Sequence, residues 1–160
     1  MEFLRGEKEV EAAQWMNAAS MTARHALCQR AKCGAVIVNN SEIIGKGYNA
    51  PPLDNIKCCM CSEQLRPNKQ KYDATCCIHA EWRAIIDALK NTAEKIKGSR
   101  LYFISIDDNG MIKKSEKPYC TVCSRLALDT GIAEFLLWHR DGICAYPTDE
   151  YNNLSYQFTG

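Results

Sequence analysis

The sequence predicts a three-layer α/β/α fold, in which a mixed sheet of about five strands carries helices on both faces. Segments with helical periodicity alternate with short runs of β-branched residues, and the first two of these runs are arranged as a hairpin. The length agrees, because 160 residues with 46% apolar side chains suit one domain that folds without a disulfide framework. We therefore expect residues 1–160 to form a single domain.

The first half of the chain begins with a helix and continues into the hairpin. Apolar side chains recur at spacings of three and four over residues 7–28, which is typical of an amphipathic helix. Residues 34–38 and 42–48 are expected to be strands, and the turn residues 39–41 join them. Residues 50–78 have no regular period and contain five cysteines. We expect a cysteine-rich insert there, which a bound metal orders or which moves freely.

The second half alternates helix and strand. Its expected elements are a helix over 79–89, a strand over 101–106, a turn over 107–110, a helix over 121–129 ended by Gly131, a strand over 133–138, and a last helix whose cap and acidic first turn are Thr148, Asp149 and Glu150. Strands that alternate with helices after an opening hairpin favour a mixed sheet.

Charge and hydropathy exclude several classes of protein. Lys and Arg number 20 and Asp and Glu number 19, so the net charge of +1 gives no broad basic field for nucleic acid or an anionic membrane. No run approaches the ~20 apolar residues of a membrane-spanning helix. The first residues lack the basic and then apolar pattern of a secretory signal. We expect a soluble cytoplasmic protein with neither a membrane nor a nucleic-acid partner.

Ten cysteines are unusual for a cytoplasmic protein of this length, and seven of them lie in three close groups. In a reducing compartment, clustered cysteines more often bind metal than form disulfides. His79, Cys120 and Cys123 stand at the starts of two predicted helices and offer one imidazole and two thiols. Three such ligands leave a fourth position on zinc for water, which is typical of a catalytic site. Glu81 lies two residues beyond His79, where it can move a proton from that water to a substrate nitrogen.

The order His79-Ala80-Glu81, then Pro118-Tyr119-Cys120-Thr121-Val122-Cys123, resembles the zinc deaminase signature H-x-E…P-C-x-x-C. Together with Cys28-Gln29-Arg30, the run 34–38 and Gly47-Tyr48-Asn49, it is similar to the cytidine deaminase superfamily, closest to its deoxycytidylate deaminase branch. The resemblance covers residues 28–140. It departs at Tyr119, which stands where proline usually precedes the first cysteine, and at Cys33, where valine is common.

The resemblance implies a cytidine deaminase-like fold and roles for several residues. His79, Cys120 and Cys123 would hold the catalytic zinc, and Glu81 would shuttle protons. Asn49 would contact the sugar and the backbone of Ala80 the pyrimidine carbonyl. Further substrate candidates have plain alternatives. Arg30, with Arg24 and Lys32 nearby, meets a 5′-phosphate or belongs to a solvated helix end; Tyr146 lies near the substrate or is a surface tyrosine; Tyr119 lines the pocket or simply packs.

The cysteines of the insert suggest a second, structural zinc, which some deoxycytidylate deaminases hold in this region. Its expected ligands are Cys58, Cys61, Cys76 and Cys77, with Cys59 as an alternative to Cys58. Free buried thiols or a redox disulfide are the other interpretations. We expect Cys28, Cys33 and Cys144 to be small core residues, and His25 and His139 not to be ligands.

The function that follows is zinc-dependent hydrolytic deamination of a cytosine nucleotide, foremost deoxycytidylate to deoxyuridylate with release of ammonia. The alternative substrates are cytidine, cytosine, guanine and adenosine in tRNA. From other classes, a non-catalytic zinc-binding module and a redox sensor built on the insert cysteines remain open. The resemblance also implies a homo-oligomer.

Overall fold

One mixed sheet forms the centre of the computed structural model, which describes residues 1–59, 61, 76–115 and 117–157. The strands are β1 (Glu2–Phe3), β2 (Lys32–Asn39), β3 (Glu42–Tyr48), β4 (Arg100–Ile106), β5 (Ile112–Lys113), β6 (Glu134–His139) and β7 (Gly142–Pro147). Their order across the sheet is β1-β7-β6-β4-β2-β3, and β5 pairs with β4. Two strands have only two residues, so the five longer strands agree with the predicted count.

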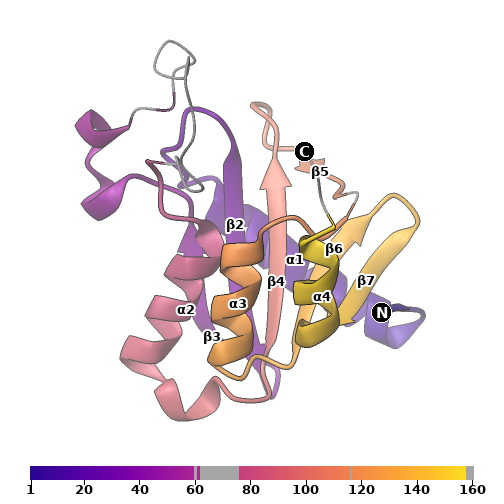
Figure 1. Cartoon of the computed structure of the whole chain (residues 1–160). Coiled ribbons are helices and arrows are strands. Elements are labelled where there is room, and N and C mark those ends of the chain that lie inside the picture. Colours follow the sequence, from indigo (N-terminus) through magenta and orange to yellow (C-terminus); the bar gives the residue numbers. More distant parts are fainter. Residues whose placement is uncertain (60, 62–75, 116, 158–160) are drawn as a thin grey trace.

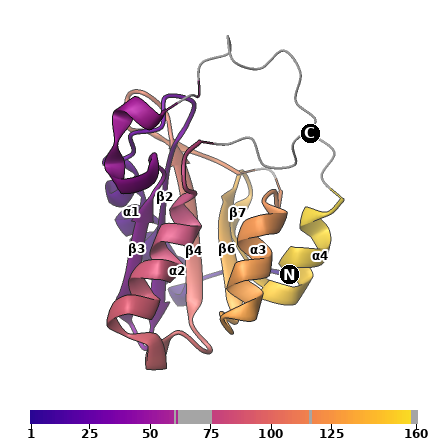
Figure 2. The same ribbon diagram turned by 60° about the vertical axis from the view of Figure 1, so that its left-hand side comes forward.

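Helices cover both faces of this sheet (Figures 1 and 2), as predicted. They are α1 (Glu7–Ala23), α2 (Ala80–Asn91), α3 (Thr121–Asp129) and α4 (Thr148–Ser155), with short 3-10 turns at Pro52–Asp54, Ile56–Cys58 and Ala93–Lys95. Helix α1 buries Met16 and Ala19 against one face, with Val36 and Ile104 of the sheet. The other three helices share a second core with the opposite face. The three-layer α/β/α prediction is therefore confirmed.

The hairpin and the crossover follow the sequence pattern. β2 and β3 pair antiparallel, with Asn39 opposite Glu42. The two residues between them, Asn40 and Ser41, have φ of 48° and 57°, as a tight hairpin turn requires. β4 and β6 are parallel, which makes the sheet mixed. The chain from β4 to β6 runs through α3, whose N-terminus thus lies at the same end of the sheet as that of α2 (Figure 1).

Three local predictions were wrong. The first helix ends at Ala23 and not at residue 28, because the Leu27 N–H bonds to the Asn49 carbonyl and draws the chain toward the end of β3. Strand β7 was missed, since four of its residues in succession are buried and leave no alternation to detect. Thr148 is the first helical residue rather than the cap, which is Pro147. Much of the insert, residues 60 and 62–75, lies outside the described residues.

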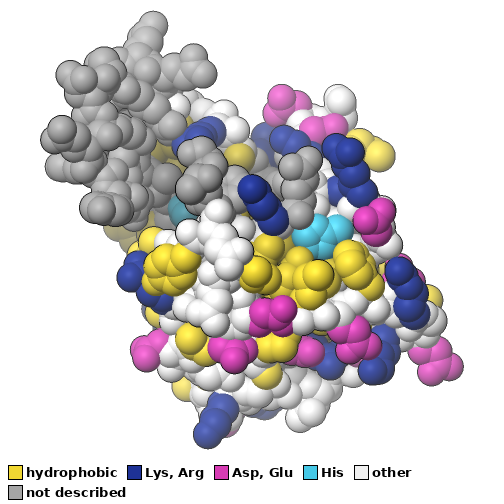
Figure 3. All heavy atoms as spheres, turned by 45° about the vertical axis from the view of Figure 1, so that its right-hand side comes forward, with side chains coloured by type: hydrophobic (Ala, Val, Ile, Leu, Met, Phe, Trp, Pro, Cys, Tyr) yellow, Lys and Arg dark blue, Asp and Glu magenta, His cyan; other side chains and the backbone are white. Residues whose placement is uncertain are grey.

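The surface agrees with a balanced charge. On the face in Figure 3, acidic and basic side chains are interspersed rather than gathered by sign. Ion pairs such as Arg83–Asp54 (2.8 Å) and Lys95–Glu42 (2.7 Å) join opposite charges. Within the described parts of the chain, no helix combines the length and the apolar character that crossing a bilayer demands.

Gly47 allows β3 to lie directly on the start of α2. A Cβ atom at this position would stand 2.1 Å from the Ala80 carbonyl oxygen and 2.4 Å from the Ala84 nitrogen. Such contacts force the helix away from the strand, so we expect Gly47→Ala to destabilise the fold by about 1–3 kcal/mol in urea unfolding. Lys46→Ala, at an exposed side chain beside it, is the matched control and should stay within about 0.5 kcal/mol of the wild type. Equal stability of the two variants would contradict this close approach.

Candidate active site

Two helix N-termini position the predicted catalytic residues. His79 is the N-cap of α2, and Cys120 is the N-cap of α3. The Cys120 sulfur accepts the backbone N–H of Cys123 at 3.2 Å, so Cys120 caps its own helix while Cys123 occupies the first turn. Ile78, the residue before His79, is also fixed in place, because it exchanges backbone hydrogen bonds with Ala50. Backbone pairing and capping therefore fix where these side chains start.

The three predicted ligand atoms converge. The Nδ1 atom of His79 lies 3.1 Å from the Cys123 sulfur and 3.4 Å from the Cys120 sulfur, and the two sulfurs are 2.8 Å apart. Hydrogen bonds with Cys123 and His79 lower the pKa of Cys120 to about 4. Burial raises the pKa of Cys123 well above its usual value. Two sulfur atoms and one imidazole nitrogen thus share a small volume.

This donor set fits a zinc ion. Nitrogen and thiolate sulfur are its preferred ligands, and tetrahedral coordination would separate the donor atoms by about 3.4–3.8 Å. The two nitrogen–sulfur separations are at most a few tenths of an ångström shorter, and the sulfur–sulfur separation is about 1 Å shorter. A small outward rotation of the side chains would accommodate the ion.

Glu81 is the buried carboxyl group of the site. Only 5% of its surface is exposed, on the first turn of α2. Burial raises its pKa to about 7, and the negative charge of Cys120 adds to the rise. A carboxyl group that titrates near neutral pH both accepts and donates protons, which suits a general acid–base residue.

A cavity of about 330 Å³ opens onto these groups. Besides His79, Glu81 and Cys120, its lining includes Asn49, Ala80 and Arg30, three of the four residues predicted to bind substrate. Arg30 is the one Lys or Arg side chain among the lining residues within the described chain. Phe103 and Ala31 also line it, although the sequence interpretation missed them; they resembled ordinary core and loop residues.

The side chain of Asn49 lines the cavity and also hydrogen-bonds to the backbone of two other lining residues. Its Oδ1 atom accepts the Cys33 N–H at 2.8 Å, and its Nδ2 atom donates to the Ala31 carbonyl at 2.8 Å. One N–H of the amide and one acceptor position on its oxygen remain for a ligand. Asn49 can therefore bind a sugar hydroxyl while it fixes the segment next to Arg30.

Tyr146 is not part of the cavity lining, contrary to the prediction. It is buried in β7, and its hydroxyl lies 2.7 Å from Nε2 of His139. Neither of the two open interpretations, a residue near the substrate or a surface tyrosine, describes it. The prediction was wrong because strand β7 was missed. The side chain of Tyr146 points from this strand into the core beneath α4.

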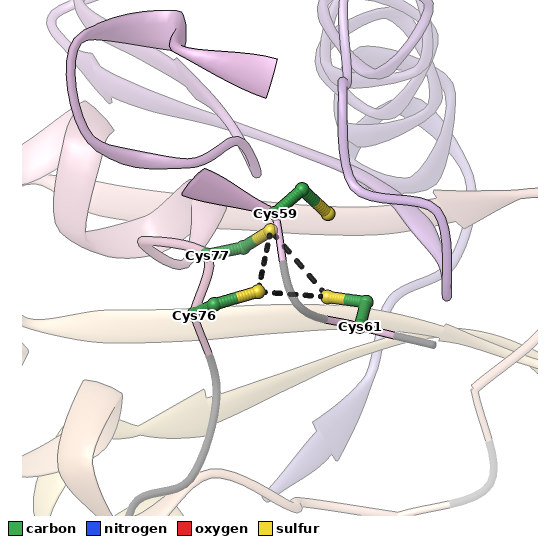
Figure 4. A group of neighbouring side chains, drawn as sticks. All are labelled: Cys59, Cys61, Cys76 and Cys77. Carbon is green, nitrogen blue, oxygen red and sulfur yellow. Dashed lines mark hydrogen bonds between the residues drawn. The ribbon is translucent and has the colours of Figure 1, made fainter. Parts of the chain in front are cut away.

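Four further sulfurs lie close together (Figure 4), and those of Cys61 and Cys77 belong to residues that line the cavity. Cys59, Cys61, Cys76 and Cys77 bring their sulfur atoms within 4.8 Å of one another. Cys61 is 3.1 Å from Cys76 and 3.7 Å from Cys77, and Cys76 is 3.9 Å from Cys77. We call these four residues the insert cysteine cluster. Sulfurs around a tetrahedral zinc would be about 3.7 Å apart, close to these values.

Two cysteine predictions need correction here. Cys58 ends a short 3-10 turn with its side chain exposed, so Cys59 replaces it in the cluster. Cys28 is buried as expected, but its sulfur lies 3.6 Å from that of Cys61, next to the cluster rather than in the apolar core. Cys33 lines the cavity, and burial raises its pKa to about 12. Cys144 is a core residue, as predicted.

An imidazole, two thiols and a buried carboxyl group meet at two helix N-termini, on a sheet that helices cover on both faces. This arrangement defines a class of protein, the zinc-dependent hydrolytic enzymes. The family model described as "Cytidine and deoxycytidylate deaminase zinc-binding region" matches residues 9–138. The chain therefore belongs to the cytidine and deoxycytidylate deaminase family, which confirms the resemblance and, with it, the enzyme class.

Individual proteins agree with this membership. The deoxycytidylate deaminase of Mycobacterium phage D29 is 30% identical over 125 residues, which cover 74% of this chain and 86% of the relative. The dCMP deaminase of cyanophage S-TIM5, solved in complex with dCMP and dUMP, shares the fold with a TM-score of 0.58 at 24% identity over 82% of each chain. Cytidine deaminase from Burkholderia pseudomallei superposes with a TM-score of 0.57 at 17% identity, over 87% of this chain and 94% of that one.

Proposed function

We propose that the protein deaminates deoxycytidylate to deoxyuridylate, with a catalytic zinc ion held by His79, Cys120 and Cys123. The observation that carries the proposal is the cavity, because it joins the metal-ligand group and Glu81 to a sugar-binding amide and one cation. Its volume of about 330 Å³ suits a mononucleotide rather than a polynucleotide. The deoxycytidylate deaminase of phage D29, at 30% identity, supports the same substrate.

The bound metal would supply Lewis-acid activation, which lowers the pKa of water to about 7. The remaining steps belong to Glu81. It removes a proton from the attacking water and delivers it to ring N3 while a C–O bond forms at C4. It then carries the proton of the new C4 hydroxyl to the amino nitrogen, the C4–N bond breaks, and ammonia leaves. The net change is one water consumed and one ammonia released.

The direct test is a screen for ammonia release from cytosine, cytidine, deoxycytidine, their monophosphates, guanine and adenine. We expect deoxycytidylate to have the highest kcat/KM. Preference for an unphosphorylated nucleoside would refute the assignment of a nucleotide substrate. Preference for guanine or adenine would refute the assignment of cytosine as the base that is deaminated. Absence of any turnover by zinc-loaded protein would favour the binding-module alternative.

Arg30 is proposed to bind the 5′-phosphate. A charged hydrogen bond of this kind is worth about 1.5–3 kcal/mol. We therefore expect Arg30→Ala to lower kcat/KM for deoxycytidylate about 10–100-fold and to change that for deoxycytidine much less. Arg24→Ala is the matched control, because Arg24 lies outside the cavity lining and near Gly110. Equal losses on both substrates would make Arg30 a structural residue.

A second ion is proposed at the insert cysteine cluster. The four sulfurs support a closed, thiolate-rich tetrahedral site, which is typical of structural rather than catalytic zinc. Hydrogen bonds from the backbone of Gln29 and Cys61 lower the pKa of Cys59 to about 7, which favours a thiolate there. Cys61 and Cys77 also line the cavity, so an ion at this cluster would order part of the substrate-binding wall.

We further infer a reducing, cytoplasmic location, since both proposed metal sites need their thiols in the reduced form. The implied homo-oligomer stays a prediction. Exposed apolar side chains on α2 and α3, Ile86, Leu89 and Leu128, are compatible with a subunit contact. Light scattering coupled to size-exclusion chromatography would measure the mass.

A further inference from the structure

Tyr151 of α4 is a buried residue behind the active site that the proposed mechanism does not use. Only 2% of its surface is exposed. Its ring stacks on Phe135 of β6 with centroids 3.9 Å apart and an angle of 16° between the planes. The ring of Tyr146 meets it edge-on at 5.7 Å. Packing on two sides therefore fixes where the phenol oxygen points.

That oxygen reaches the segment that carries a metal ligand. The backbone N–H of Tyr119 donates to the Tyr151 hydroxyl at 3.5 Å, and the next residue is Cys120. Burial raises the pKa of Tyr151 well above its usual value, and the negative charges of Glu81, Cys123 and Cys120 add to the rise. The phenol thus stays neutral within electrostatic range of the whole catalytic group. Proline has no N–H, so a proline at position 119 could not make this bond.

A second set of contacts ties α4 to the helix that carries Cys123. The Ser124 hydroxyl donates to Oδ1 of Asn152 at 2.9 Å and lies 3.3 Å from the Ser155 hydroxyl. Ser124 directly follows Cys123 and is fully buried. The last helix therefore contacts the chain on both sides of the Cys120–Cys123 pair.

We propose that Tyr151 is a positioning residue for the metal site: its phenol oxygen, held by the stack on Phe135, accepts the Tyr119 N–H and so fixes the backbone that presents Cys120. This inference rests on the proposed zinc site and extends it to a helix outside the signature motif. Tyr151 touches no substrate in this role. It acts through the orientation of a ligand, as outer groups of metal sites commonly do.

The test is Tyr151→Phe, which keeps the ring and removes the hydroxyl. Zinc affinity of the catalytic site is read as the free zinc concentration that gives half-maximal activity in chelator-buffered solutions. We expect a rise of about two- to tenfold, equivalent to about 0.4–1.4 kcal/mol. Amide hydrogen exchange in the peptide 118–123, measured by mass spectrometry, should become faster at Tyr119 because its acceptor is gone.

Tyr102→Phe is the matched control. Tyr102 is equally buried, but it belongs to the core on the other face of the sheet. The control should lose stability without changing zinc affinity or exchange at Tyr119. If Tyr151→Phe behaves like this control, Tyr151 is only a core residue and the inference is refuted.

A second variant covers the case in which Tyr151→Phe does not fold. Tyr119→Pro removes the N–H and leaves Tyr151 in place, so it should raise the half-saturating zinc concentration by a similar factor. Unchanged zinc affinity in that variant would overturn the inference. Wild-type protein that binds no zinc would instead contradict the proposed function, and hydrogen exchange at Tyr119 would still test the bond to Tyr151.

Discussion

Glu81→Gln is expected to lower kcat by roughly 10²–10⁴-fold or more, because the amide keeps the shape of the side chain but carries no proton between water and substrate. The carboxyl group is buried beside the ligand group, and its pKa of about 7 suits it to give and take protons. The measurement is steady-state ammonia release from deoxycytidylate. Zinc content should be unchanged, since Glu81 is not one of the three converging donor residues.

Glu94→Gln supplies the matched control, because Glu94 is an exposed carboxylate in a short 3-10 turn beyond α2. It should retain wild-type kcat. Near-normal turnover by Glu81→Gln would refute the proposed mechanism. A loss of zinc along with activity would mean that the substitution damages the site rather than the proton transfer.

Cys61→Ser is expected to remove one of two zinc ions per chain and leave the other. Cys61 has the shortest sulfur–sulfur contact of the insert cysteine cluster, 3.1 Å to Cys76, and contacts Cys77 as well. Because binding of a structural ion contributes folding free energy, its loss should increase cleavage by proteases close to Cys61 and Cys76. KM for deoxycytidylate should rise more than kcat falls, since Cys61 lines the cavity but takes no part in the proton transfer of the proposed mechanism.

Cys58→Ser separates this effect from the general loss of a cysteine. Cys58 is exposed and outside the cluster, so this variant should keep both ions. One zinc per chain in the wild-type protein under reducing conditions would refute the second site and leave the catalytic site untouched. Mass-spectrometric thiol counting with and without a chelator distinguishes metal from disulfide: thiols that a chelator does not unmask would indicate the redox alternative.

The residues around the catalytic group were predictable because their arrangement is local. His79 and Glu81 are separated by one residue at a helix start, and Cys120 and Cys123 span the first turn of another helix. Helix geometry then fixes how each pair points. Alternation of helix and strand predicted that both helices pack on one sheet, and the parallel pairing of β4 with β6 brings their N-termini to one end.

Long-range packing decided what the sequence left open. Cys59 rather than Cys58 joins the insert cysteine cluster because the 3-10 turn ends at Cys58. Two adjacent cysteines have the same side chain, so the sequence alone does not show which of them faces the cluster. Cys28 reaches Cys61 only because the chain after α1 bonds to the end of β3. Tyr146 is buried because β7 is a strand buried on both faces, and Tyr151 reaches the Tyr119 N–H from α4.

By itself, the sequence predicted the fold class from periodicity, and the two halves of the proposed catalytic site from spacing within one helical turn. The family resemblance joined His79 and Glu81 to Cys120 and Cys123, which lie 41 or more positions from His79. The tertiary structure alone decided which thiols share a cluster, which cation lines the cavity and which buried phenol contacts the ligand segment. The contacts of Cys28 with Cys61 and of Tyr119 with Tyr151 join residues 33 and 32 positions apart. Their distances follow from how the helices pack on the sheet, which local patterns do not encode.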